Sequence, residues 1–129
     1  MLASNEADSD YKELIRRAWR NRKGAKFFEI EVATPEQALE VAGVICSEQM
    51  LDTGCPCILM LDNFSASKAA ATVKEFQKMG YHKQILLEAS GKINEESLAE
   101  YAASGVDAIS VGALTHSAAA LDLSAKLIP

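Results

Sequence analysis

The chain has 129 residues, with 13 Lys or Arg against 18 Asp or Glu, and its formal net charge is −5. Apolar residues make up 49% of it and charged residues 24%, the profile of one soluble globular domain. A complete parallel (β/α)₈ barrel takes about 250 residues, so the length excludes one. The acidic balance argues against a nucleic-acid partner, although backbone N–H groups can still bind small anions.

Neither a membrane span nor a signal peptide is predicted. No apolar run approaches the ~20 residues that cross a bilayer. Residues 1–10 lack the basic region and the apolar core of a secretory signal. We therefore expect a cytoplasmic protein with no membrane partner.

The chain has three cysteines, Cys46, Cys55 and Cys57. The odd count and the Cys-Pro-Cys spacing fit neither a secreted disulfide framework nor a four-ligand zinc site. We expect reduced thiols, with Cys57 in the core because it opens an apolar run.

Residues 8–22 repeat apolar side chains at the spacing of one helical face, which predicts an amphipathic helix. Asp8 or Ser9 should begin it, and Gly24 should stop the chain beyond its basic end. Aromatic and β-branched residues over 26–32 then predict a strand.

The segment Thr34-Pro35-Glu36-Gln37 predicts the start of a second helix. Thr34 can cap it, proline suits the first helical position, and Gln37 can complete a capping box. This helix should run to about Met50.

The next strand is predicted over 57–61, a continuous apolar run of the kind found in strands covered on both faces. Asp62-Asn63 ends it. Ser65 or Ser67 should then begin a helix that runs to about Met79, where a glycine follows.

Residues 84–88 repeat the pattern of a buried strand. Asn94 should cap a short helix through Ala103, and 107–111 should form the last strand. Alanine and leucine over 115–127 predict a final helix.

Four strands that alternate with helices indicate right-handed βαβ units. The predicted fold class is α/β, with four parallel strands, and an all-antiparallel sheet is excluded. We treat residues 1–129 as a single domain, with an N-terminal helical segment over 1–25 and βα units over 26–129.

Carboxylates and small-residue turns follow the predicted strands, and ligands of parallel sheets bind outside the carboxyl ends of strands. The carboxylates are Glu31 and Asp62, and the turns are Ser90-Gly91 and Gly112-Ala113. Small turns expose N–H groups, and helices starting there would add positive potential for a phosphate. Two carboxylates suit a divalent metal or sugar hydroxyls. Each feature alone is explained as a cap or a turn, but together they favour a sugar-phosphate site.

Five motifs carry a family resemblance, and they lie in this order at residues 29–37, 60–64, 87–91, 105–117 and 120–124. They resemble the carboxyl-terminal half of quinolinate phosphoribosyltransferase, also called carboxylating nicotinate-nucleotide pyrophosphorylase. The resemblance covers nearly everything from Phe28 onward and implies a half (β/α) barrel of that type.

The resemblance implies a transferase that uses Mg²⁺. Its family makes nicotinate mononucleotide, CO2 and pyrophosphate from quinolinate and phosphoribosyl pyrophosphate in the synthesis of NAD. By resemblance, Glu31 and Asp62 would be the catalytic carboxylates facing the ribose and its metal. The 5′-phosphate would be bound by Ser90, Gly91, Gly112 and Ala113. His116 would lie beside that phosphate, although a helix-cap or surface histidine is the alternative.

Two departures from the family pattern bear on activity. Lys92 stands where the family usually has a second glycine, a residue that tolerates positive φ. The cations that hold quinolinate in this family precede the strand that corresponds to Phe28, so we expect the isolated chain to be inactive. Arg16 and Arg20 share a helical face and could replace those cations, but the spacing is more typical of a solvated face with Trp19 turned inward.

Two functions stay open at this stage. In the first, the chain is part of a quinolinate phosphoribosyltransferase. In the second, it is a non-catalytic half-barrel that binds sugar phosphates or a partner. Open strand edges and an uncovered inner face also predict a homo-oligomer. A flattened sheet covered by the helix over 8–22 is the competing arrangement.

Overall fold

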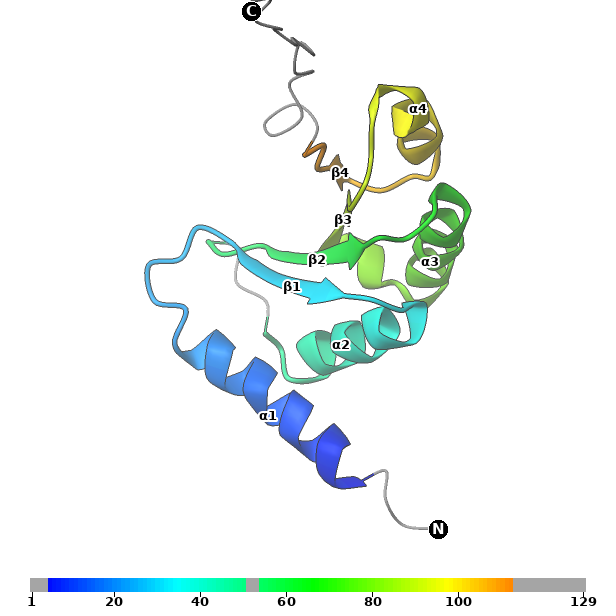
Figure 1. Ribbon diagram of the computed structural model, residues 1–129. Coiled ribbons are helices and arrows are strands. Elements are labelled where there is room, and N and C mark those ends of the chain that lie inside the picture. Colours follow the sequence, from blue (N-terminus) through cyan, green and yellow to red (C-terminus); the bar gives the residue numbers. More distant parts are fainter. Residues whose placement is uncertain (1–4, 51–53, 113–129) are drawn as a thin grey trace, which may run out of the picture.

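The computed structural model describes residues 5–50 and 54–112, where four strands alternate with four α-helices and one short 3₁₀ helix (Figure 1). In chain order the elements are α1 (Asn5–Arg20), β1 (Phe28–Val32), α2 (Pro35–Ser47), β2 (Cys57–Asp62), α3 (Ala66–Met79), η1 (Tyr81–Lys83), β3 (Ile85–Ser90), α4 (Glu95–Ala103) and β4 (Ala108–Ile109). The predicted helix over 115–127 lies outside the described residues.

The four strands form one parallel sheet with the order β1-β2-β3-β4. Strands adjacent in sequence are therefore adjacent in space, as they are in the wall of a (β/α) barrel. A doubly wound sheet would instead reverse its strand order and carry helices on both faces. The predicted α/β class with parallel strands is confirmed.

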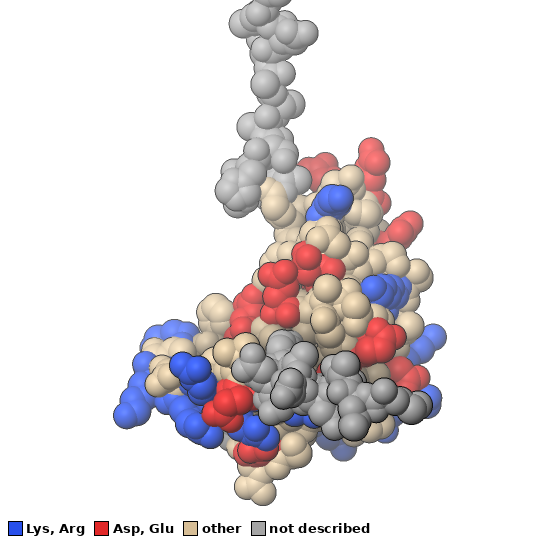
Figure 2. Space-filling view, turned by 60° about the horizontal axis from the view of Figure 1, so that its bottom comes forward, with Lys and Arg blue, Asp and Glu red and all other residues tan. Residues whose placement is uncertain are grey.

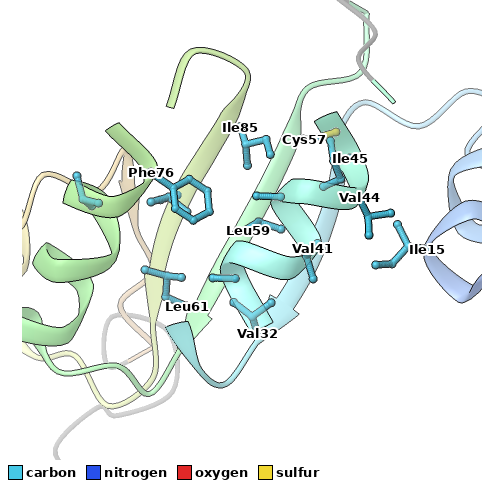
Figure 3. Close-up of a cluster of buried hydrophobic side chains, with 14 of the residues drawn as sticks. Ile15, Val32, Val41, Val44, Ile45, Cys57, Leu59, Leu61, Phe76 and Ile85 are labelled. Atoms are coloured by element: carbon cyan, nitrogen blue, oxygen red, sulfur yellow. The ribbon is translucent and has the colours of Figure 1, made fainter. Parts of the chain in front are cut away.

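The core lies between one face of the sheet and helices α1, α2 and α3 (Figure 3). In β2, alternate side chains point into it, and Leu59 and Leu61 are fully buried. Ile58 and Met60 alternate with them and are only half-buried. The expectation that 57–61 is covered on both faces is thus wrong for the described chain. A strand in a barrel wall is apolar on its second face too, since that face points toward the barrel interior.

Helix α1 begins and ends earlier than predicted, at Asn5 and Arg20. It packs against the core through Ile15, and the Trp19 ring meets the Phe28 ring edge-on at 5.3 Å between centroids. The inward position of Trp19 is therefore confirmed.

The start of α2 is capped as predicted, but only half of the capping box forms. The Thr34 hydroxyl accepts a hydrogen bond from the Gln37 N–H at 3.2 Å. The Gln37 side chain accepts from the N–H of Ala33 at 3.0 Å, one residue before the cap.

The end of α2 falls at Ser47, three residues before the predicted Met50. Gln49 adopts a left-handed φ of 52°, and the Met50 N–H bonds back to the Ile45 carbonyl at 2.9 Å. This is a helix stop of the kind that glycine usually provides. Since no glycine stands there, the sequence carried no signal for it.

The caps of the next two helices agree with the sequence. Ser65 caps α3, and Gly80 ends it with a φ of 77°. Asn94 caps α4 in a reciprocal capping box with Ser97. Strand β4 is shorter than predicted, Ala108–Ile109 instead of 107–111, and just before it the Asp107 carboxylate accepts the Leu87 N–H at 2.8 Å.

All three cysteines are free thiols, as predicted, and Cys57 is buried in the core. Its thiol donates to the Met50 carbonyl at 3.4 Å. Burial raises the pKa of Cys57 to about 11. Within residues 5–50 and 54–112, no helix is both long and apolar enough to cross a membrane.

Candidate functional site

The carboxyl ends of β2 and β3 bring Asp62 directly opposite Ser90. Glu31 pairs in register with Met60, which places Asp62 two residues further along the same face. Side chains two residues apart in a strand point to the same side, so Glu31 and Asp62 are diagonal neighbours on the face not covered by helices. Two carboxylates and a serine thus share one edge of the sheet.

Asn63 links the turns that follow β2 and β3. Its side-chain NH₂ donates to an Asp62 carboxylate oxygen at 2.8 Å. Its backbone N–H donates to the Ser90 carbonyl at 2.9 Å. The residue takes a left-handed φ of 54°, a conformation that asparagine tolerates better than most residues.

Gly91 is required by this contact. A Cβ at Gly91 would lie 2.6 Å from Oδ1 of Asn63 and 2.8 Å from its backbone nitrogen. The Gly91 φ of 94° also disfavours other residues. Lys92 stands where the family usually has a second glycine, and it nevertheless adopts a positive φ of 54°. The backbone conformation that glycine favours is therefore present here without glycine.

Helix α4 does not begin at the Ser90-Gly91 turn. Its first residue is Glu95, the Asn94 side chain accepts the Ser97 N–H while the Ser97 hydroxyl accepts the Asn94 N–H, and its first turn is acidic. The expectation that a helix start adds positive potential at this turn is therefore wrong for β3. An anion bound at the Ser90-Gly91 turn would be held by the N–H groups of the turn and by the Ser90 hydroxyl.

A group of carboxylates on the uncovered face includes two residues that the sequence analysis did not single out, Glu29 and Glu88. Partial burial, and then the charges of Glu88 and Glu31, raise the pKa of Glu29. Glu88 is hydrogen-bonded to the Ser110 hydroxyl across β3 and β4. The alternation of Glu29 and Glu31 was visible in the sequence, but the position of Glu88 on the same face, level with Glu31 across β2, depends on strand register.

Tyr101 also holds the turn after β2, and the sequence did not reveal this contact. From α4, its hydroxyl donates to the Phe64 carbonyl at 2.6 Å, and the Phe64 side chain is buried. The turn after β2 is therefore held by α4 as well as by β3.

Gly112 lies at the end of the described chain, just after β4, and is exposed. The N–H of Ser110 donates to the Ala89 carbonyl at 2.9 Å and keeps this end of β4 beside β3. The predicted site residues Ala113 and His116 lie outside the described residues. Within them, the structure brings together Asp62, Ser90 and Gly91.

The residues present fit a magnesium ion that a bound phosphate would help to coordinate. No set of three His, Cys, Asp or Glu side chains placed to hold a metal occurs among the described residues. Mg²⁺ is commonly held by one or two carboxylates, with substrate phosphates and water completing its octahedron. Glu31 and Asp62 are two carboxylates on one face of the sheet, the donor type that such a site requires.

Three arginines on or just after α1 are engaged in contacts within the described chain. Arg16 pairs with Glu48 at 2.7 Å and lowers the pKa of that carboxyl, while Arg20 lies 3.5 Å from Glu13. The Arg22 guanidinium stacks 3.5 Å above the Trp19 ring. Figure 2 shows many of the basic side chains gathered at one side of the molecule with acidic ones among them, while other basic side chains lie elsewhere on this face. Arg16 and Arg20 therefore lie on a partly solvent-exposed helix face, where they form ion pairs with carboxylates.

A cavity of about 420 Å³ opens on that side, lined by Arg22, Lys23, Gly24, Ala25, Gly54 and Cys55. These residues precede β1 and β2, so the cavity lies at the amino ends of the strands. It is at the opposite edge of the sheet from Asp62 and Ser90.

The described chain thus consists of consecutive parallel βα units, with helices on one face of the sheet and polar side chains at the carboxyl ends of its strands. Residues 3–126 match the family model described as quinolinate phosphoribosyl transferase, C-terminal domain. The chain therefore belongs to this family.

Curated relatives agree with this assignment. The chain is 38% identical over 120 residues to a probable carboxylating nicotinate-nucleotide pyrophosphorylase of Methanocaldococcus jannaschii, covering 91% of the chain and 38% of the relative. It is 36% identical over 107 residues to the corresponding probable enzyme of Archaeoglobus fulgidus, covering 83% of the chain and 38% of the relative. The chain thus spans well under half the length of these relatives.

A solved structure, the nicotinate-nucleotide pyrophosphorylase from Francisella tularensis, superposes with a TM-score of 0.65 at 28% identity. The match covers 88% of this chain and 35% of that one. The predicted α/β fold, with four parallel strands that alternate with helices as in structures of this family, is confirmed.

Proposed function

We propose that this chain supplies the phosphoribosyl pyrophosphate side of the active site of a carboxylating nicotinate-nucleotide pyrophosphorylase. That enzyme forms nicotinate mononucleotide, CO2 and pyrophosphate from quinolinate and phosphoribosyl pyrophosphate in NAD biosynthesis. The observation that carries the proposal is the pairing of Asp62 with Ser90 at the carboxyl edge of a sheet belonging to this family.

Each side chain at this edge has a role suited to its chemistry. Glu31 and Asp62 would hold Mg²⁺, which neutralises the pyrophosphate leaving group when bound. The Ser90 hydroxyl and the N–H groups of Gly91 and Gly112 would bind the 5′-phosphate. Ala113 and His116 would extend that phosphate site.

The isolated chain would bind phosphoribosyl pyrophosphate without turning over quinolinate. Quinolinate carries two carboxylates, which need paired cations when they are removed from water. In the described chain, the basic side chains Arg16, Arg20 and Arg22 lie on or just after α1, in structural contacts away from Asp62. Preorganised donors are commonly the largest catalytic contribution, and the loss of one costs roughly 10²–10³ in rate.

The test is calorimetric titration of the chain with phosphoribosyl pyrophosphate, with and without Mg²⁺. We expect one binding site whose affinity rises with Mg²⁺, and Asp62→Asn should abolish that rise. Glu75→Gln is the matched control, since Glu75 also loses one charge but lies on α3 beside Lys78, at 3.0 Å. Equal magnesium dependence in Asp62→Asn and in the control would refute the assignment of Asp62.

A second assay tests the expectation that the isolated chain does not turn over quinolinate. The chain alone is incubated with quinolinate, phosphoribosyl pyrophosphate and Mg²⁺, and nicotinate mononucleotide is followed. We expect none. Product formed in proportion to chain concentration and abolished by Glu31→Ala would show that this chain holds quinolinate by itself.

A further inference from the structure

The turn after β2 carries a residue that contacts three parts of the proposed site at once. Asn63 donates from its side chain to Asp62 at 2.8 Å and from its backbone to the Ser90 carbonyl at 2.9 Å. Its side chain also packs against Gly91 so closely that a methyl group there would overlap it.

These contacts constrain the Asp62 carboxylate. One of its oxygens accepts the Asn63 hydrogen bond, which leaves the second oxygen without a hydrogen bond from the described chain. A carboxylate held in this way presents one oxygen in a fixed direction, the arrangement by which outer hydrogen bonds orient metal ligands. A carboxylate free to rotate would lose that orientation.

The backbone of Asn63 makes the same turn rigid. Its left-handed φ of 54° lets the N–H reach Ser90 while the next residue, Phe64, enters the core. Tyr101 fixes the Phe64 carbonyl from the other side at 2.6 Å. The position of Asn63 therefore does not depend on a bound ligand.

We propose that Asn63 is a positioning residue that aims Asp62 and holds the Ser90-Gly91 turn against it, coupling the metal and phosphate halves of the site. The inference rests on the proposed function, because it assumes that Asp62 and Ser90 bind one ligand. Asn63 itself need not touch that ligand.

The first test is Asn63→Gly, which removes the side chain and retains the left-handed backbone. Glycine adopts this φ freely, so the variant should fold. The increase in phosphoribosyl pyrophosphate affinity caused by Mg²⁺ should shrink by about tenfold, the size expected for one charge-assisted hydrogen bond. Binding of inorganic phosphate without Mg²⁺ should change much less.

Gln49→Gly is the matched control. Gln49 is an exposed residue with a φ of 52°, and it lies just after α2, at the opposite edge of the sheet. The Gln49→Gly variant should leave unchanged both the affinity for phosphoribosyl pyrophosphate with Mg²⁺ and the affinity for inorganic phosphate without it. An unaltered magnesium effect in Asn63→Gly would overturn the inference while leaving the proposed function intact.

A second test needs no ligand. Gly91→Ala should lower the melting temperature more in the unaltered chain than in the Asn63→Gly background, where the Asn63 side-chain atoms at 2.6 and 2.7 Å are gone. An equal fall in melting temperature in the two backgrounds would show that the Asn63 side chain does not pack against Gly91, and would overturn the inference. Failure of the unaltered chain to bind phosphoribosyl pyrophosphate would overturn the proposed function and, with it, the role of Asn63 in binding.

Discussion

Removing the Tyr101 hydroxyl should weaken the turn that carries Asp62. In Tyr101→Phe, the ring stays but the 2.6 Å hydrogen bond to the Phe64 carbonyl is lost. A hydrogen bond of this kind contributes about 0.5–1.5 kcal/mol net, and leaving a partly buried carbonyl unpaired puts the loss toward the upper end. We therefore expect a loss of about 1 kcal/mol.

The assay is thermal unfolding followed by circular dichroism, with urea titration as a second measure. For a chain of this length, about 1 kcal/mol corresponds to a fall of roughly 3–6 °C in melting temperature. The urea midpoint should fall while the slope stays constant, because the same surface is exposed on unfolding.

Tyr81→Phe provides the matched control. Tyr81 packs its ring against Phe76 at 5.6 Å between centroids, and none of the hydrogen bonds found in the described chain uses its hydroxyl as donor. We expect its melting temperature to change by less than about 1 °C. Equal shifts in melting temperature in the two variants would refute the reasoning. The loss in Tyr101→Phe would then be the general effect of removing a tyrosine hydroxyl and not the loss of this hydrogen bond.

The remaining predictions concern charge, thiols and assembly. Burial and the charges of Glu88 and Glu31 raise the pKa of Glu29, so the folded state binds its proton more tightly than the unfolded state does and stability falls as pH rises through that pKa. Glu29→Gln should therefore be more stable than the unaltered chain at pH 7 and lose this advantage at acid pH below the unfolded pKa of Glu, as thermal unfolding at several pH values would show. With iodoacetamide at pH 8, half-buried Cys46 should be alkylated before Cys57, whose pKa is about 11, and mass spectrometry of digests taken over time would detect the reverse order. The outer edge of β1 is unpaired in the described chain and the face bearing Met60 is uncovered, so we propose self-association, and sedimentation showing a monomer at every concentration would contradict it.

The order of strands and helices was predictable because local signals decide it. Thr34, Ser65, Asn94 and Gly80 stand where helices begin or end, and each acts through its own side chain or backbone freedom. The early end of α2 was not predictable, since Gln49 takes a conformation that its residue type does not favour.

The candidate site was predictable only as separate pieces. Asp62 and Ser90 follow strands, but their direct pairing is a property of register between strands distant in sequence. The same holds for Glu88, which register places level with Glu31 across β2, and for Tyr101, which reaches a backbone carbonyl 37 positions away. Hydrogen bonds to backbone atoms distant in sequence leave no trace in residue patterning, so the support that Tyr101 and Ser90 give to the turn after β2 could not be foreseen.

The central claim is that the ligand binds at the carboxyl edge of the sheet, and amide chemical-shift mapping by NMR tests it most directly. Phosphoribosyl pyrophosphate with Mg²⁺ is titrated into the ¹⁵N-labelled chain. The account predicts that the largest shifts occur at Asn63, Ser90, Gly91 and Gly112. Shifts concentrated at Gly24, Ala25 and Gly54, which line the cavity at the amino ends of the strands, would contradict it.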